Sequence, residues 1–114
     1  MTRHIFMVVT RPPPGETEEY GKWYVEQHIP HVLDVPGFVS AQRFLLAPGP
    51  DETSSALRYL AIYEIETDDI ATVLDELGAR AGSNAMPLYA GSDAKMVMRL
   101  VGEAVTPKIL RPES

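Results

Sequence analysis

The chain has 114 residues, of which 45% are hydrophobic and 23% charged, and its 16 acidic and 10 basic residues give a net charge of −6. This composition excludes intrinsic disorder and suits one compact domain, and the negative charge has the wrong sign for binding nucleic-acid phosphates. The absence of cysteine excludes disulfides, thiolate chemistry and Cys-based zinc or iron–sulfur sites.

No stretch of the chain has the length of a membrane span. The longest uninterrupted apolar run covers only residues 5–9, and the first residues do not form a signal peptide. We therefore expect a cytoplasmic protein with neither a membrane nor a nucleic acid as its partner.

Hydrophobic periodicity predicts the elements of the first half of the chain. β-branched and apolar residues over 4–10 predict a strand, which three prolines at 12–14 bring to an end. A helix is predicted from Thr17, its N-cap, and we expect Pro30 to end or kink it. The face predicted to point inward carries Tyr20, Trp23, Tyr24, Gln27 and His28. Residues 38–47 are predicted to form the second strand.

The second half continues with the same kinds of element. Residues 47–55 read as a turn-rich polar loop, and 57–65 as a third strand antiparallel to the second. We expect Thr67 or Asp68 to cap a second helix. Its apolar positions follow the spacing i, i+3, i+4, i+7 and are Ile70, Val73, Leu74 and Leu77. Residues 95–101 are predicted to form the fourth strand.

The resulting order β-α-β-β-α-β predicts an α+β, ferredoxin-like fold, with a four-stranded antiparallel sheet and both helices on one face. We expect the domain to cover residues 1–102. A tail over 103–114 follows without periodicity, and its Ile109 and Leu110 suit an arm that lies on a partner subunit.

Both faces of the predicted sheet carry apolar side chains. In the third strand, Leu60 and Ile62 alternate with the series that contains Tyr59, Ala61 and Tyr63. An antiparallel sheet with one solvated face alternates apolar with polar residues, so the second face requires a cover. Because both helices occupy the first face, we expect a homodimer in which two sheets close into one barrel.

The most informative stretch for chemistry contains the only tryptophan and two of the three histidines. His28 falls one turn after Tyr24 on the inward face, where a neutral imidazole is suited to general base catalysis and a tyrosine hydroxyl to proton donation. A structural histidine at a helix end is the alternative reading. His31 is either a second acid or base or a surface residue, and His4 is expected at an edge or terminus.

Three further side chains are candidates for binding a substrate. An arginine among apolar strand residues requires an anion, so Arg43 is a candidate for binding a carboxylate or enolate, with Glu64 or Glu66 as alternative partners. Tyr59 and Tyr63 share one strand face and either line a cavity or pack with a polar tip. The histidines lack a third ligand at metal-binding spacing, and no nucleotide-binding loop or nucleophile elbow occurs, so we expect no metal and no cofactor.

These residues resemble the EthD-like family of the dimeric α+β barrel superfamily. The similarity runs over most of residues 4–101, and its segments are Trp23-Tyr24-x-x-x-His28-x-Pro30, residues 35–44 and residues 59–64. The resemblance implies a ferredoxin-like protomer that forms a homodimer. Five positions carry the motif in this chain: Trp23, Tyr24, His28, Pro30 and Arg43.

The wider superfamily includes muconolactone-type isomerases, polyketide cyclases, quinone-forming monooxygenases and haem-degrading enzymes. The haem-degrading relatives use an Asn-Trp-His set. The only asparagine here, Asn84, is predicted in a loop after the second helix, which departs from that set.

The leading hypothesis is a cofactor-independent isomerase, cyclase, lyase or monooxygenase that acts on an aromatic, lactone or polyketide-like substrate. His28, Tyr24 and His31 are the expected catalytic residues, and the expected substrate-binding residues are Trp23, Arg43, Tyr59 and Tyr63. A homodimer that binds or carries a small ligand without catalysis is the alternative, and a purely structural domain is the third hypothesis.

Overall fold

Four strands and two helical regions follow one another in the predicted order in a computed structural model that describes residues 1–48, 57–89 and 95–113. The elements are β1 (Thr2–Arg11), α1 (Thr17–Trp23), the π-helical turn η1 (Tyr24–His28), α2 (Ile29–Leu33), β2 (Phe38–Leu45), β3 (Tyr59–Thr67), α3 (Ile70–Arg80) and β4 (Lys95–Glu103). The loop predicted over 47–55 lies, after Pro48, outside the described residues.

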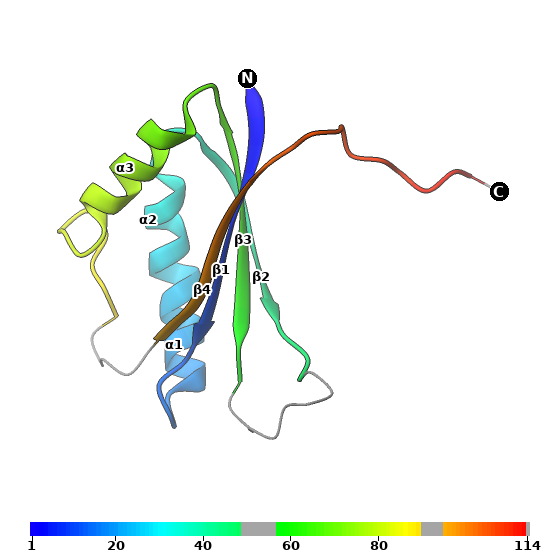
Figure 1. The fold of residues 1–114 in the computed structure, drawn as a ribbon. Helices are drawn as coiled ribbons and strands as arrows, with labels where there is room; N and C mark the ends of the chain where they lie inside the picture. Colours follow the sequence, from blue (N-terminus) through cyan, green and yellow to red (C-terminus); the bar gives the residue numbers. More distant parts are fainter. Residues whose placement is uncertain (49–56, 90–94, 114) are drawn as a thin grey trace.

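The strands pair antiparallel in the order β2-β3-β1-β4. α1, η1 and α2 follow one another as a single rod, and this rod and α3 lie on the same side of the sheet (Figure 1). The predicted ferredoxin-like α+β fold is confirmed.

Of the two expectations for Pro30, the end of the helix is wrong, because helical structure continues past it, whereas the helix is irregular just before it. The residues from Tyr24 onward wind as a π-helix in which the N–H of Ile29 donates to the carbonyl of Tyr24, and α2 then includes Pro30. Proline has no N–H, and its ring clashes with the carbonyl one α-helical turn earlier, so the wider turn accommodates it. The additional residue in this turn also leaves Gln27, predicted to face inward, exposed.

The core lies between the helices and the sheet and is rich in aromatic rings. The Phe6 ring lies 6.2 Å from that of Phe38 and 5.8 Å from that of Tyr63, measured between centroids, and all three side chains are buried. His4 shares this face and is buried on β1, an interior strand, with Nε2 3.6 Å from a carboxylate oxygen of Glu103. The expectation that His4 lies at an edge or terminus was therefore wrong.

The N-cap of α3 lies one residue after Asp68 and two after Thr67, the two predicted caps. This N-cap is Asp69, whose side chain accepts a hydrogen bond from the Thr72 N–H at 3.2 Å. Gly37, in the turn before β2, has a φ of +106°, and a Cβ there would lie 3.0 Å from a methyl carbon of Val73. Glycine at this position thus allows the turn and α3 to approach closely.

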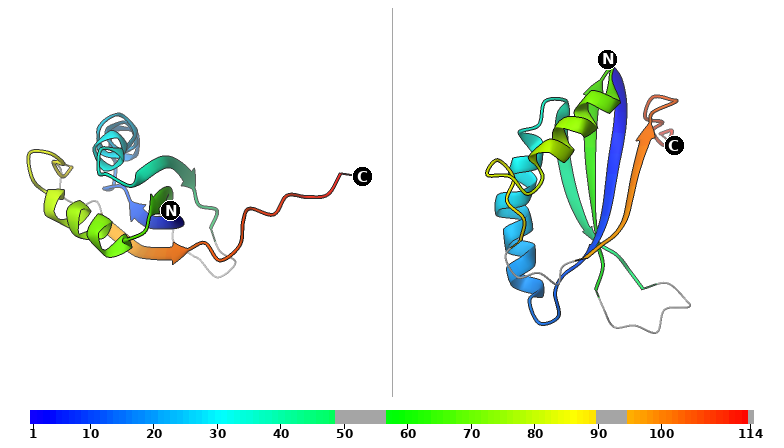
Figure 2. Two further views of the ribbon diagram at one scale, coloured as in Figure 1. Left: turned by 90° about the horizontal axis from the view of Figure 1, so that it is seen from above. Right: turned by 60° about the vertical axis from the view of Figure 1, so that its left-hand side comes forward.

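The other face of the sheet has no helix over it (Figure 2). The strand registers bring eight apolar side chains together there, from all four strands. We call this set the open sheet face: Ile5, Met7, Val9, Phe44, Leu60, Ile62, Met98 and Leu100. Both faces of the sheet are therefore apolar, as predicted. A register shift between Val9 and Thr10 places Met96 on the helix-covered face, opposite to Met98.

Residues 104–113 form no regular secondary structure, whereas Glu103, expected at the start of the tail, is the last residue of β4. They extend away from the sheet on the side opposite the helices (Figures 1 and 2). Val105, Ile109 and Leu110 are each more than three-quarters exposed. No helix in the described part of the chain is long and apolar enough to cross a bilayer.

Candidate functional site

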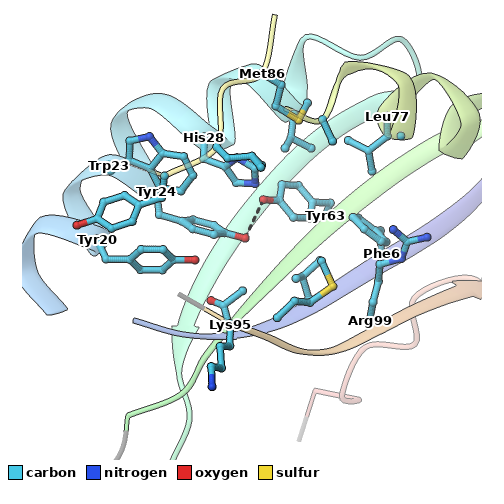
Figure 3. A pocket seen from close by; sticks show the side chains of 18 residues that line it. Phe6, Tyr20, Trp23, Tyr24, His28, Tyr63, Leu77, Met86, Lys95 and Arg99 are labelled. Atoms are coloured by element: carbon cyan, nitrogen blue, oxygen red, sulfur yellow. Dashed lines mark hydrogen bonds between the residues drawn. The ribbon is translucent and has the colours of Figure 1, made fainter. Parts of the chain in front are cut away.

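A cavity of about 380 Å³ lies between the helices and the covered sheet face. Aromatic rings form much of its wall: Phe6, Tyr20, Trp23, Tyr24, Tyr63 and Tyr89 (Figure 3). His28 also lines it, as do the cationic residues Lys95 and Arg99, and no acidic residue of the described chain does. A volume of this size suits a small organic molecule, and such walls favour a ring system.

Two tyrosine hydroxyls meet in this cavity. The Tyr24 hydroxyl, from η1, lies 3.3 Å from the Tyr63 hydroxyl of β3, at hydrogen-bond distance, and both side chains are buried (Figure 3). Burial raises the pKa of both phenols because the phenolate loses its solvation. Both hydroxyls therefore remain protonated at neutral pH and are available as hydrogen-bond donors.

His28 lies against two of the aromatic rings. Its ring stacks on Trp23, with centroids 5.0 Å apart and planes at 20°, and its centroid is 4.8 Å from that of Tyr24. Burial, and secondarily the charge of His31, lowers the pKa of His28 to about 4, so the imidazole is neutral at pH 7. Nδ1 is enclosed without a hydrogen-bond partner among the described residues, and the ring forms part of the cavity wall.

His31 does not line the cavity with His28. It lies in α2, and its Nδ1 is enclosed without a hydrogen-bond partner among the described residues. The two histidines are close enough for the charge of His31 to act on His28, but of the two only His28 lines the cavity with Tyr24 and Tyr63.

Arg43 also lies outside the cavity wall. Its guanidinium carbon is 3.9 Å from the centroid of Tyr59 and 5.0 Å from that of Tyr24. Glu64 and Glu66, the suggested internal partners, form ion pairs with Arg3 instead. Nε and one terminal nitrogen of Arg43 are enclosed without a hydrogen-bond partner. Arg43 is thus held among tyrosine rings, and Tyr59 serves as one of those rings rather than as cavity wall.

Sequence reasoning missed several residues of the wall, notably Tyr89 and Arg99. Tyr89 follows α3 and donates a hydrogen bond from its hydroxyl to Glu16 at 2.8 Å. This bond raises the pKa of Tyr89 to about 12. No local pattern marks Tyr89, because it lies in an irregular segment. Arg99 was detectable, since it alternates with apolar residues in a predicted strand in the same way as Arg43.

Neither a metal cluster nor the asparagine of the haem-degrading set is found at this site. Within residues 1–48, 57–89 and 95–113, no group of three or more His, Asp or Glu side chains could hold a metal ion. Asn84 is exposed in the turn after α3 and does not line the cavity.

Fold and site together define a small α+β protein whose aromatic-walled cavity presents one neutral imidazole and two phenol hydroxyls. No family model and no curated protein matches the sequence significantly. Solved structures do match its fold.

One match is the haem-degrading protein MhuD of Mycobacterium tuberculosis, solved with two haems in its active site. It is 23% identical, with 92% of this chain and 98% of that chain covered and a TM-score of 0.56. A candidate monooxygenase from Shewanella loihica PV-4 is 14% identical over 98% and 99% of the two chains, with a TM-score of 0.53. An ethyl tert-butyl ether D (EthD) family protein from Bacillus halodurans C-125 is 15% identical over 92% and 100%, with a TM-score of 0.46. The likenesses to MhuD and to the Shewanella protein show that the chain shares their ferredoxin-like α+β fold.

Proposed function

We propose that the protein is a small-molecule enzyme that moves a proton on an aromatic, lactone or polyketide-like substrate without a metal or organic cofactor. The substrate binds in the cavity between the helices and the sheet. The observation that carries this proposal is the meeting of a neutral, ligand-accessible imidazole with two phenol hydroxyls in an apolar cavity. The fold of known haem-degrading enzymes and of a candidate monooxygenase is consistent with it.

In this proposal, Nε2 of His28 takes a proton from an acidic carbon or hydroxyl of the substrate and returns it to another atom. The low pKa keeps the ring unprotonated at neutral pH, and burial also makes it a weaker base than a solvated imidazole, so it suits substrates with an acidic proton. It also makes the imidazolium a strong acid that returns the proton readily. Stacking on Trp23 holds the ring in one orientation.

The charge that develops on the substrate oxygen is stabilised by the Tyr24–Tyr63 pair. Both hydroxyls are protonated and fixed by their mutual contact, and they lie in an apolar, low-dielectric surrounding where hydrogen bonds to an oxyanion are strongest. The guanidinium of Arg43 lies 5.0 Å from the Tyr24 ring, and its positive charge stabilises negative charge near the Tyr24 hydroxyl. Arg43 is therefore proposed as a positioning residue, and His31 as one that tunes His28 through its charge.

We also propose that the enzyme is a homodimer joined through the open sheet face. Both helical regions of the described chain pack on the other face of the sheet. A second copy of the chain would therefore bury the open sheet face. The tail leaves β4 on this same side with three exposed apolar residues, which suits an arm lying on the partner subunit. In this arrangement residues 1–102 form the domain and 103–114 the arm.

The competing function is a dimer that binds a small ligand without chemistry. It needs the same cavity but no proton transfer. Exchange of ligand protons with the solvent therefore distinguishes the enzyme from the carrier. Compounds that bind are found by thermal shift from a panel of aromatic acids, hydroxyquinones, lactones and haem. Each is then incubated in D₂O with the protein, and incorporation of deuterium is followed by NMR.

We expect deuterium incorporation into at least one bound compound, its loss in His28→Ala, and its retention in Gln27→Ala, which alters an exposed residue of the same turn. Binding with no exchange by the wild-type protein would favour the carrier. Deuterium exchange that persists in a folded His28→Ala variant would show that His28 is not the general base. Cleavage of haem would instead extend the functional likeness to MhuD.

A further inference from the structure

The β4 side of the cavity carries an arginine that forms no ion pair with any residue in the described part of the chain. Arg99 lies on the helix-covered face of β4 at register with Val8, and its guanidinium carbon is 5.6 Å from the centroid of Phe6. Arg99 is exposed and lines the cavity. Its place beside Phe6 is visible in Figure 3, where the ammonium of the other cationic residue, Lys95, points away from the aromatic rings.

The ion pairs among the described residues leave Arg99 out. Arg3 pairs with Glu64 and Glu66, and Arg80 with Glu76. No acidic side chain of the described chain lines the cavity, although acidic residues outnumber basic ones in the sequence. A guanidinium at the edge of an apolar cavity, with no carboxylate beside it, is a site for an anionic group of a ligand.

Ring contacts connect Arg99 to the proton-transfer groups across the cavity. Phe6 lies beneath Arg99 and 5.8 Å from Tyr63 between ring centroids, and the Tyr63 hydroxyl is 3.3 Å from that of Tyr24. His28 lies beyond Tyr24, at 4.8 Å between centroids. The cavity therefore has a cationic end and a proton-transfer end with aromatic walls between them.

From this arrangement we infer that Arg99 binds a carboxylate of the substrate, and that the substrate class is a ring compound with a carboxylate at one end and its reacting group at the other. This inference rests on the proposed function for the position of the reacting group. It transfers to Arg99 the role that the sequence suggested for Arg43, whose guanidinium is enclosed by tyrosine rings instead.

The experiment uses paired probes that differ only in the charge of one group: naphthoate with naphthamide, and coumarin carboxylate with coumarin carboxamide. Trp23 is the only tryptophan and lines the cavity, so quenching of its fluorescence reports binding. We expect the wild-type protein to bind the carboxylates at least tenfold more tightly than the amides, because one charge-assisted hydrogen bond is lost with the charge.

Three variants test the assignment. Arg99→Gln should reduce the carboxylate preference to near one with amide affinity unchanged, and Arg99→Lys should restore part of it. Lys22→Gln removes the same charge from the exposed side of α1 and should keep the full preference. An unchanged preference for carboxylates in Arg99→Gln would mean that Arg99 contacts solvent rather than the ligand, and it would overturn the inference. So would a wild-type protein that shows no preference or binds none of the probes.

Binding and chemistry are measured separately, so the two proposals fail separately. A carboxylate preference that depends on Arg99, with no deuterium exchange, would support the role of Arg99 in binding and contradict the proposed enzymatic function. Deuterium exchange into neutral compounds only, at a rate that Arg99→Gln leaves unchanged, would support the enzymatic function and contradict the role of Arg99.

Discussion

The Trp23 and His28 rings stack five residues apart in sequence, with centroids 5.0 Å apart and planes at 20°. In a regular α-helix the neighbours along one face are three or four residues apart. The π-helical turn from Tyr24 to His28 closes its ring over five residues and so brings this pair into contact. π-Helical turns are frequent at functional sites, and here the turn supplies the enclosed imidazole.

The low pKa of His28 predicts a loss of stability in acid. The folded protein keeps the ring neutral down to about pH 4, whereas the unfolded chain protonates near pH 6.5. Between these values the unfolded state binds the additional proton, so stability falls as the pH falls through this window. We expect about 2 kcal/mol of the free energy of unfolding to be lost between pH 7 and pH 4.5. Urea unfolding at both pH values measures it.

His28→Asn, which cannot titrate in this range, is the control for that loss. The difference between the two proteins isolates this group from the carboxylates that titrate below it. An NMR titration giving His28 a pKa near its ordinary value would contradict the prediction, and both proteins would then lose stability equally.

The Tyr24–Tyr63 contact predicts non-additive effects of removing the two hydroxyls. Tyr24→Phe or Tyr63→Phe leaves the remaining buried hydroxyl without its partner, which should cost about 1 kcal/mol of stability. The double variant has no orphaned hydroxyl, so it should cost little more than either single one. Urea unfolding of all four proteins gives the coupling energy, and strict additivity would mean that the hydroxyls do not interact.

Arg43 should act on Tyr24 through its charge. Its guanidinium lies 5.0 Å from the Tyr24 ring, and it opposes the rise in the pKa of that phenol. Arg43→Met should therefore raise the pKa of Tyr24 further, whereas Arg43→Lys, which keeps the charge, should raise it less. The titration of each tyrosine is followed by NMR of the ring carbon that bears the hydroxyl. Equal pKa values in the two variants would assign Arg43 a packing role only.

The open sheet face predicts a dimer that one lysine can break. Leu60 lies between Val9 and Phe44 in the strand register, within the apolar rows of this face. In a dimer, Leu60→Lys would bury two unpaired ammonium groups, so we expect the dimer dissociation constant to rise at least a hundredfold. Light scattering measures the mass. Ala79→Lys, on the exposed side of α3, is the matched control. A wild-type monomer at micromolar concentration would refute the interface.

The tail predicts a further effect on the same equilibrium. Val105, Ile109 and Leu110 are exposed in the single chain, and burial of such side chains on a partner stabilises a dimer by about 1.5–3 kcal/mol each. Because about 1.4 kcal/mol corresponds to a tenfold change, burial of one of them already predicts that a chain ending at Ala104 dissociates at about tenfold higher protein concentration, and burial of all three predicts a larger rise. An unchanged dissociation constant would show that the tail is not an arm.

The sequence predicted the fold well because alternating and helical periods depend on which side chains can be buried. The four strands and both helices stand where these periods indicated, with boundaries shifted by a few residues. The errors lie where local rules compete: a wider turn accommodates Pro30 within the helical region, and Asp69 caps α3 rather than Thr67 or Asp68. Of the seven candidate site residues, the cavity wall contains four: Trp23, Tyr24, His28 and Tyr63.

The sequence by itself determined the strand and helix order, the two apolar sheet faces and the exclusion of cysteine chemistry, because these follow from composition and periodicity. Only the tertiary structure decided which of two similar side chains meets the cavity. His28 lines it and His31 does not, and Arg99 lines it while Arg43 is enclosed by tyrosine rings. The reason is geometric: the π-helical turn before Pro30 sets the direction of His28, and the register of β4 against β1, which pairs residues distant in sequence, sets that of Arg99.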